Sequence, residues 1–375
     1  MLSTLTIDLG AIRRNAERLR DLVAPSAFAA VVKSNAYGHG LVETALALAG
    51  VTDLLAVYAL EEALALRSGG ITAPILILGP VAPRDLPRAH AAPAAITIWD
   101  SGAYFNEVVR VARERGAPFS IHVKINTGVA RLGLEPHQAA DAIALYLRTP
   151  QVRLCGVFTH LAAAEELEAM FTDRQIYTMH QALEPVEEEL ERGGVIRHAA
   201  ASAAAIMWSQ TRLQMVRVGL ALYGLWPSPE TRKVAERRLR LEPALRWTSH
   251  LVAVREVAAG VSIGYGRSYT TPAPTRIGVV PIGYADGVPR AASNRGAVLA
   301  GGRRCTIVGR VCMNMFMVDL GPGTGAAAPS SITLIGQDGE DRISAEDWAT
   351  WSDTINYELV ARLPEHLHRE FIPAG

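Results

Sequence analysis

A lysine stands at the end of a short apolar run, a place where barrel and sheet enzymes often keep reactive groups. Residues 30–40 read AVVKSNAYGHG, so Lys33 follows a β-branched stretch and precedes a polar turn broken by glycine. A lysine amine that is partly removed from water can form a Schiff base with a carbonyl group. This stretch alone is equally typical of a solvated lysine at a strand end, so the interpretation depends on other residues in the same setting.

Several other candidate residues also end apolar runs or follow them closely. They are Arg131, His160, Ser202, Arg217 and Gly219. One such residue is most often a solvated rim residue, whereas a group of them indicates a site. Together these residue types suit pyridoxal phosphate. An amine can bind its aldehyde, and arginines can bind its ring nitrogen or an anion. A serine before an alanine-rich helix start can bind its phosphate. No metal site is expected, because no HxxxH, CxxC or carboxylate cluster has ligand spacing.

The first two thirds of the chain alternate short apolar runs with helical patterns, which predicts an α/β fold. The runs are 28–33, 53–58, 74–78, 95–99, 119–126, 152–160, 195–202 and 215–219. Helical segments such as 60–67, 103–115 and 165–192 separate them. Eight runs of this kind fit a (β/α)8 TIM-type barrel, whose strand ends meet at one mouth. An open doubly wound sheet is the alternative, but the chain has no GxGxxG turn or P-loop.

After a charged segment at 230–241 the character of the sequence changes. Short β-type runs at 247–257, 275–282, 296–299, 305–308, 316–320 and 331–335 are separated by Pro and Gly turns. This pattern predicts a C-terminal mainly-β domain. A helix is expected at 345–351 with Ser344 as its N-cap, and another from Asn356. We therefore expect a barrel over 1–235 and a β domain over 236–375.

The composition excludes several classes of protein. The 37 basic and 37 acidic residues cancel, which argues against a nucleic-acid partner. The three cysteines are too few and too scattered for a disulfide framework. No signal peptide and no membrane-spanning run is evident, so a cytoplasmic protein without a membrane partner is expected.

Eight motifs in order along the chain resemble those of bacterial alanine racemases. They are AVVKSNAYGHG (30–40), KINTGVARLG (124–133), GVFTHL (156–161), MVRVGLALYG (215–224), IGYG (263–266), PIGYADG (281–287), GRVCM (309–313) and TINYE (354–358). The resemblance extends into both expected domains. It implies a pyridoxal-phosphate enzyme that acts on a small amino acid as a head-to-tail homodimer and supplies D-alanine for peptidoglycan.

The resemblance also implies roles for individual residues. Lys33 and Tyr265 would be the two catalytic bases, with Lys33 also holding the cofactor and Tyr265 coming from the partner subunit. Cofactor contacts would come from Tyr37, His160, Ser202, Arg217, Gly219, Leu220 and Tyr357. Arg131 and the backbone of Met313 would bind the substrate carboxylate, and Tyr284 would line the entrance.

The chain departs from the family pattern at Asn126 and Asn314, where aspartates are usual, and at residues 129–131, which read VAR in place of MGR. The exchanges are either neutral or they alter substrate entry, rate or specificity. Lys124 matches a lysine that is often carbamylated in the family, and we expect the carbamate here too.

Three other functions are compatible with parts of the sequence. A racemase of broader specificity, for example for serine, is the nearest. A non-catalytic carrier of pyridoxal phosphate would need neither the β domain nor Tyr265. A decarboxylase of the same fold type would lack the lysine–tyrosine pair of bases.

Overall fold

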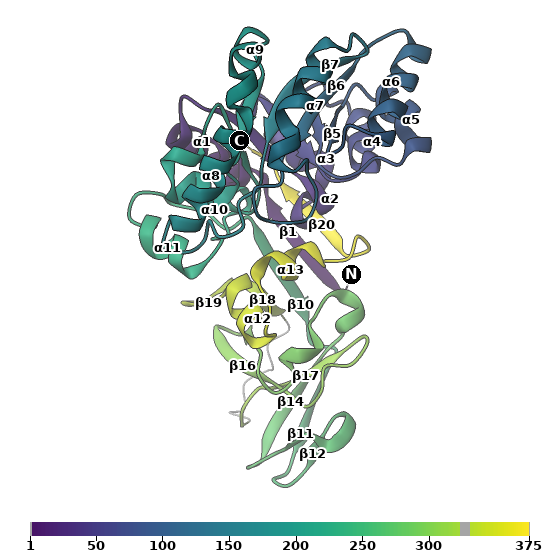
Figure 1. Ribbon diagram of the computed structural model, residues 1–375. Coiled ribbons are helices and arrows are strands. Elements are labelled where there is room, and N and C mark those ends of the chain that lie inside the picture. Colours follow the sequence, from purple (N-terminus) through teal and green to yellow (C-terminus); the bar gives the residue numbers. More distant parts are fainter. Residues whose placement is uncertain (1, 323–330, 375) are drawn as a thin grey trace. The chain divides into compact units, whose positions relative to one another are not determined.

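The computed structural model describes residues 2–322 and 331–374, which form two compact units (Figure 1). One unit comprises Gly10–Ala36 and Leu41–Pro243. The other comprises the described residues of Met1–Leu9, Tyr37–Gly40 and Ala244–Gly375. No helix among these residues is long and apolar enough to cross a membrane.

The first unit is built on a closed barrel of eight parallel strands, as the sequence predicts. The strands are β2 (Ala27–Val31), β3 (Leu54–Val57), β4 (Ile75–Ile77), β5 (Ala95–Ile98), β6 (Phe119–Lys124), β7 (Val152–Phe158), β8 (Ile196–His198) and β9 (Met215–Val218). Each corresponds to one of the eight predicted runs. Most residues of these strands are buried, which explains why the strands are mainly apolar runs without regular alternation. β2 pairs with both β3 and β9 and closes the ring.

Helices precede, connect and follow the strands of the barrel. They are α1 (Leu9–Val23), α3 (Leu41–Ala47), α4 (Leu60–Ser68), α5 (Leu86–Ala91), α6 (Ala103–Arg115), α7 (Pro136–Arg148), α8 (Met170–Leu183), α9 (Glu187–Arg192), α10 (Ser202–Met207) and α11 (Pro229–Ala235). The helix expected over 165–192 starts later, at Met170, and a 3₁₀ turn at Glu184–Val186 divides it. Pro185 has no N–H to donate, which fits a break at that point.

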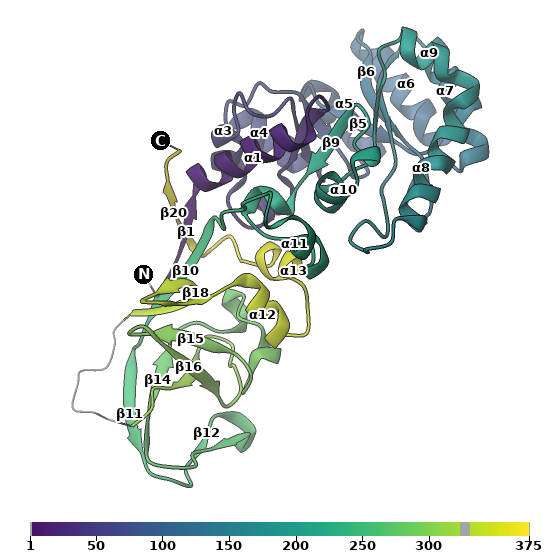
Figure 2. The same ribbon diagram turned by 90° about the vertical axis from the view of Figure 1, so that its left-hand side faces the viewer.

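The second unit contains a ten-stranded sheet (Figure 2). Its strands are β1 (Ser3–Asp8), β10 (Leu245–His250), β11 (Ala253–Val257), β14 (Thr275–Val280), β15 (Ala297–Ala300), β16 (Arg303–Val308), β17 (Phe316–Asp319), β18 (Ser331–Asp338), β19 (Asp341–Ile343) and β20 (His368–Ile372). A two-stranded ribbon, β12 (Ser262–Ile263) with β13 (Tyr269–Thr270), stands apart from it. The mainly-β prediction is confirmed.

In the second unit one predicted strand is divided in two, whereas both predicted helices are present. The run 247–257 was expected to be one strand, but it breaks after His250, and β10 and β11 take distant places in the sheet. The helices α12 (Ala345–Trp351) and α13 (Asn356–Ala361) lie where they were predicted. Ser344 caps α12 by accepting from the backbone N–H of Asp347 at 3.1 Å.

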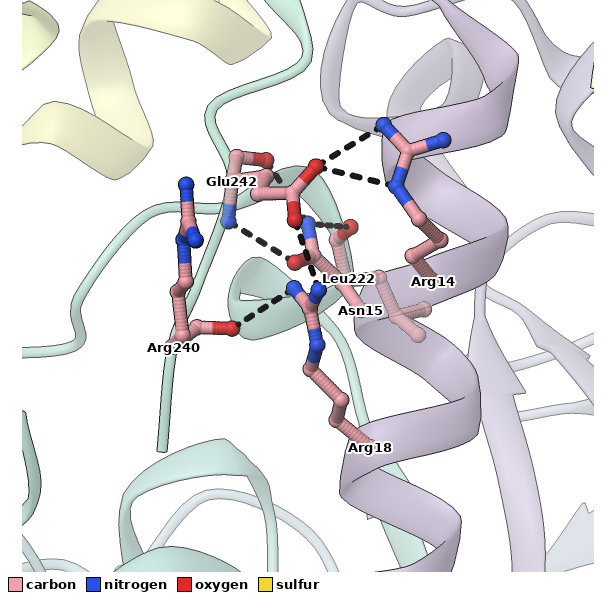
Figure 3. Close-up of polar contacts among 6 residues, drawn as sticks. All are labelled: Arg14, Asn15, Arg18, Leu222, Arg240 and Glu242. Atoms are coloured by element: carbon pink, nitrogen blue, oxygen red, sulfur yellow. Dashed lines mark hydrogen bonds and ion pairs between the residues drawn. The ribbon is translucent and has the colours of Figure 1, made fainter. Parts of the chain in front are cut away.

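Hydrogen bonds and ion pairs between Glu242 and helix α1 hold the C-terminal end of the barrel unit against that helix (Figure 3). Glu242 accepts hydrogen bonds from Arg14 at 2.8 Å and from Arg18 at 2.6 Å, both on α1. The Asn15 side chain donates to the carbonyls of Leu222 and Glu242 and accepts from the Glu242 N–H. Asn15 is fully buried, so these backbone partners replace the water that it loses.

Candidate active site

Lys33 follows the first barrel strand, in a turn of unusual hand. Residues 34–37 all have φ between 52° and 55°, the left-handed helical region. This conformation costs a residue with a side chain roughly 1–2 kcal/mol. The carboxylate of Glu62, at the start of α4, accepts from the Ser34 N–H and helps to hold the turn. Strain that the surroundings maintain in this way is common at functional sites.

The environment of Lys33 favours its neutral amine. Burial lowers its pKa below the ordinary 10.5, the positive charge of Arg131 lowers it further, and Glu62 opposes the shift. A neutral amine is the form that acts as a nucleophile or accepts a proton. The lowered pKa makes this neutral form more accessible in Lys33 than in a solvated lysine.

Arg217, on β9, is buried and surrounded by neutral acceptors. Its Nη2 donates to the carbonyls of Thr159 at 2.9 Å and Ala199 at 3.0 Å, and lies 3.4 Å from His160 Nδ1. Burial lowers the pKa of Arg217 to about 9, so the guanidinium remains a cation at neutral pH. Burial, with the nearby cations led by Arg217, lowers the pKa of His160 to about 3. His160 is therefore a neutral imidazole that accepts at Nδ1 and donates at Nε2.

Hydrogen-bond donors gather where β8 and β9 end. Ser202 begins α10, and its Oγ accepts from the backbone N–H of Gly219 at 3.0 Å and of Ala221 at 3.4 Å. Leu220 begins the 3₁₀ turn Leu220–Tyr223. A serine hydroxyl packed against the backbone N–H groups of a turn at strand ends is an arrangement that can bind a phosphate.

Lys124 ends β6 and is 5% exposed. Burial lowers its pKa to about 8, and the charges of Arg131 and Arg217 contribute to the shift. Its Nζ lies 5.9 Å from the centre of the Phe158 ring. These contacts bring Lys124 and Arg131 into the same electrostatic environment as Lys33.

The loop that carries Arg131 is shaped by Asn126. The Asn126 Oδ1 accepts from the backbone N–H of Ala130 at 2.9 Å and of Gly128 at 3.4 Å. Its Nδ2 donates to Glu135 Oε1 at 3.0 Å. An aspartate could make the first two contacts but not the third, because it has no donor. The hydrogen bond to Glu135 therefore requires the amide of Asn126 in this chain.

Sequence reasoning missed a polar group that joins the loops after β6 and β7. Thr159 Oγ1 lies 2.6 Å from Thr127 Oγ1 and donates to the Ile125 carbonyl at 3.0 Å. Gln175, fully buried on α8, donates to Thr127 Oγ1 and to the His160 carbonyl. A buried glutamine within a helical pattern was the available signal. The group fixes His160 relative to the loop of Arg131.

The second unit holds Tyr265, Tyr284 and Met313 around one cavity of about 1020 Å³. All three are exposed, Tyr265 by 72%. The Tyr284 N–H donates to the Cys312 carbonyl at 3.0 Å, which ties the turn of Tyr284 to the segment of Met313. Asn314 lines the same cavity and is also exposed.

Tyr37 and Tyr357 also belong to the second unit. Tyr37 is buried, and burial raises the pKa of its phenol well above the ordinary 10. Tyr357 lies in the first turn of α13. At Gly38, whose φ is 82°, a Cβ atom would lie 2.1 Å from the Val360 carbonyl oxygen. Glycine there lets the segment of Tyr37 pack directly on α13.

The structure thus sorts the predicted residues into two sets. The barrel set is Lys33, Lys124, Arg131, His160, Ser202, Arg217, Gly219 and Leu220. The set of the second unit is Tyr37, Tyr265, Tyr284, Met313 and Tyr357. A lysine with a lowered pKa, buried cations and phosphate-type donors at the strand ends of a (β/α)8 barrel are typical of barrel enzymes that use a phosphorylated carbonyl cofactor.

Comparison with known proteins identifies the family within this class. The family described as "Alanine racemase, N-terminal domain" matches residues 7–227, and "Alanine racemase, C-terminal domain" matches 244–371. The alanine racemases of Beutenbergia cavernae and Salinispora tropica are 39% and 40% identical, over 97% and 95% of this chain and 96% and 94% of theirs. The chain belongs to the alanine racemase family, and it is an enzyme of that class.

Solved structures agree with this assignment. The alanine racemase of Streptomyces lavendulae superposes with a TM-score of 0.92 at 34% identity, covering 100% of this chain and 97% of that one. The alanine racemase of Bacillus anthracis with bound L-Ala-P superposes with a TM-score of 0.90 at 35% identity, covering 99% and 95%.

Proposed function

We propose that this enzyme interconverts L-alanine and D-alanine with pyridoxal phosphate and two bases, as a cytoplasmic homodimer that supplies D-alanine for peptidoglycan. The observation that supports it most is Lys33, whose amine has a lowered pKa beside Arg131 at the mouth of the barrel. Family membership supports the reaction class.

The barrel residues fit the cofactor. When bound, pyridoxal phosphate supplies an electron sink that acidifies the substrate Cα–H. Lys33 would hold its aldehyde and Arg217 its ring nitrogen. Since a guanidinium only donates, Arg217 would leave that nitrogen unprotonated. Ser202 and the backbone of Gly219 and Leu220 would hold the phosphate, together with Tyr37 and Tyr357.

Racemisation needs one proton acceptor on each face of the substrate Cα. Lys33 would serve one face and Tyr265 of the partner subunit the other. Tyr265 is largely exposed in the single chain, as a residue that completes another subunit's site would be. The His160 Nε2–H would stabilise its phenolate, while His160 Nδ1 accepts from Arg217.

The substrate carboxylate would be bound by Arg131 and by the Met313 backbone N–H of the partner subunit. Tyr284 would line the entrance for a small amino acid. Carbamylation would convert Lys124 to an anion that orients Arg131. The lowered pKa of Lys124 favours this, because only the neutral amine reacts with carbon dioxide.

A panel of L-amino acids, assayed for racemisation and for decarboxylation, tests the proposal. We expect racemisation of alanine with the highest kcat/KM, and borohydride reduction should attach the cofactor to Lys33. Comparable kcat/KM for serine would favour the broader-specificity racemase. Labelling of a different lysine, or decarboxylation without racemisation, would contradict the assignment.

A further inference from the structure

Two buried histidines lie next to Arg217, and the proposed reaction uses neither. His198 on β8 and His122 on β6 are 0% and 2% exposed. His198 Nδ1 lies 2.7 Å from Arg217 Nη1, and His198 Nε2 lies 3.0 Å from His122 Nδ1. The three side chains form one line of contacts inside the barrel.

The direction of these hydrogen bonds is fixed by Arg217. A guanidinium can only donate, so His198 Nδ1 accepts and carries no proton. His198 must then carry its proton on Nε2, which donates to His122 Nδ1. His122 is in turn protonated on Nε2. Both rings are neutral in this arrangement, and burial together with the charge of Arg217 lowers the pKa of both, that of His122 to about 3.

Neutral partners hold Arg217 without cancelling its charge. The hydrogen bonds described for it end on backbone carbonyls and imidazole nitrogens, and its Cζ lies 5.0 Å from the centre of the Phe158 ring. A carboxylate in the place of His198 would bind the guanidinium at least as well. It would also neutralise the positive charge that lowers the pKa values of Lys124 and His160.

The barrel makes room for the second histidine. His122 is paired with Gly156 of β7, at the point where the register of the two strands shifts. A Cβ atom on Gly156 would lie 2.5 Å from His122 Nδ1. Any larger residue there would displace the imidazole from its contact with His198.

We propose that His198 and His122 are positioning residues of this enzyme. They form a neutral chain of hydrogen bonds, from Arg217 to His198 to His122, that fixes the guanidinium and preserves its charge at the barrel mouth. The consequence for catalysis rests on the proposed role of Arg217, whereas the arrangement of protons does not.

Nitrogen NMR of the ¹⁵N-histidine-labelled holoenzyme at pH 7 tests the proton arrangement directly. We expect His198 and His122 both to be neutral with the proton on Nε2, each assigned by loss of its signal in a single variant. A proton on Nδ1 of His198, or an imidazolium at either position, would overturn the proposal even if the enzyme proves to be an active racemase.

Three variants test the consequence. His198→Asn keeps a neutral acceptor for Arg217 and should retain kcat within a few-fold. His198→Asp should neutralise the charge of Arg217, lower kcat by about tenfold to a hundredfold, which corresponds to about one to two pKa units at the groups that this charge perturbs, and shift the visible absorption of the bound cofactor. Gly156→Ala should reproduce part of both changes without touching Arg217. Equal activity and spectra for the Asn and Asp variants would refute the role. If His198→Asp does not fold, an unchanged spectrum in Gly156→Ala would refute it.

Discussion

The Asn126–Glu135 contact gives a prediction that is specific to this chain. Asn126 accepts from two backbone N–H groups of the loop 127–131 and donates to Glu135, which precedes α7. Asn126→Asp changes one nitrogen to oxygen and keeps the shape. It removes the donor and places a second carboxylate about 3 Å from the first, judged from the 3.0 Å Nδ2–Oε1 distance.

The expected effect is moderate because Glu135 is exposed. Loss of the hydrogen bond costs about 0.5–1.5 kcal/mol, and repulsion of two carboxylates in a largely aqueous setting adds about 1 kcal/mol. The equilibrium constant for the ordered loop should therefore fall by a factor of about ten to seventy, at about 1.4 kcal/mol per tenfold change. Because the loop carries Arg131, which we propose binds the substrate carboxylate, KM for alanine should rise by about that factor and kcat should change less.

Steady-state kinetics at two salt concentrations, with hydrogen exchange of the Gly128 and Ala130 amides, measures this. The increase in KM should shrink at about 0.5 M salt, where charge repulsion is screened. Glu135→Gln in the same chain should restore KM, since a glutamine can donate to Asp at 126. Asn106→Asp, the same change on an exposed face of α6, is the control. A KM no different from that control, or no recovery in the double variant, would refute the reasoning.

Two further predictions concern the subunit arrangement and Lys124. Mixing inactive Lys33→Ala and Tyr265→Phe subunits should recover activity through one intact site per heterodimer, as a shared two-fold interface requires; no recovery after verified exchange would exclude it. Lys124 should give a carbamate signal with ¹³C-bicarbonate near neutral pH that is absent in Lys124→Ala. Because the folded-state pKa of Lys124 is lowered to about 8, the neutral fraction, and with it the signal, should rise as pH increases from about 6 to 8; a flat or falling signal would contradict the assignment.

The barrel could be predicted because each of its strands is a compact apolar run that both faces bury. The pairing at one edge of the second sheet could not be predicted. β1 and β20 pair in parallel although more than 350 residues separate them, with Thr4 opposite His368. Nothing in the sequence of either segment indicates which strand it pairs with, so this pairing could not be predicted. The break between β10 and β11 was missed for the same reason, since it depends on sheet partners distant in the chain.

Candidate site residues could be selected from the sequence where they lie at the ends of predicted barrel strands. Lys33, His160 and Arg217 became candidates in this way, because the topology alone brings such positions together. His122 and His198 were not recognised as candidates, since the sequence around a histidine in an apolar strand does not indicate which residue it contacts. Asn126 was recognised as a departure, but its match with Glu135 depends on the fold of the loop between them.

The charges at the barrel mouth explain how one set of residues can favour both nucleophilic amines and anion binding. Arg131 and Arg217 are cations. Burial lowers the pKa values of Lys33 and Lys124, and these charges lower them further, Arg131 for both lysines and Arg217 for Lys124. Arginines keep their protons under this repulsion while lysines lose theirs more readily. A site with paired carboxylates at these positions would reverse the effect and keep the lysines protonated. The neutral partners of Arg217 therefore preserve a charge that lowers the pKa of Lys124, and this favours a neutral amine beside a permanently charged guanidinium.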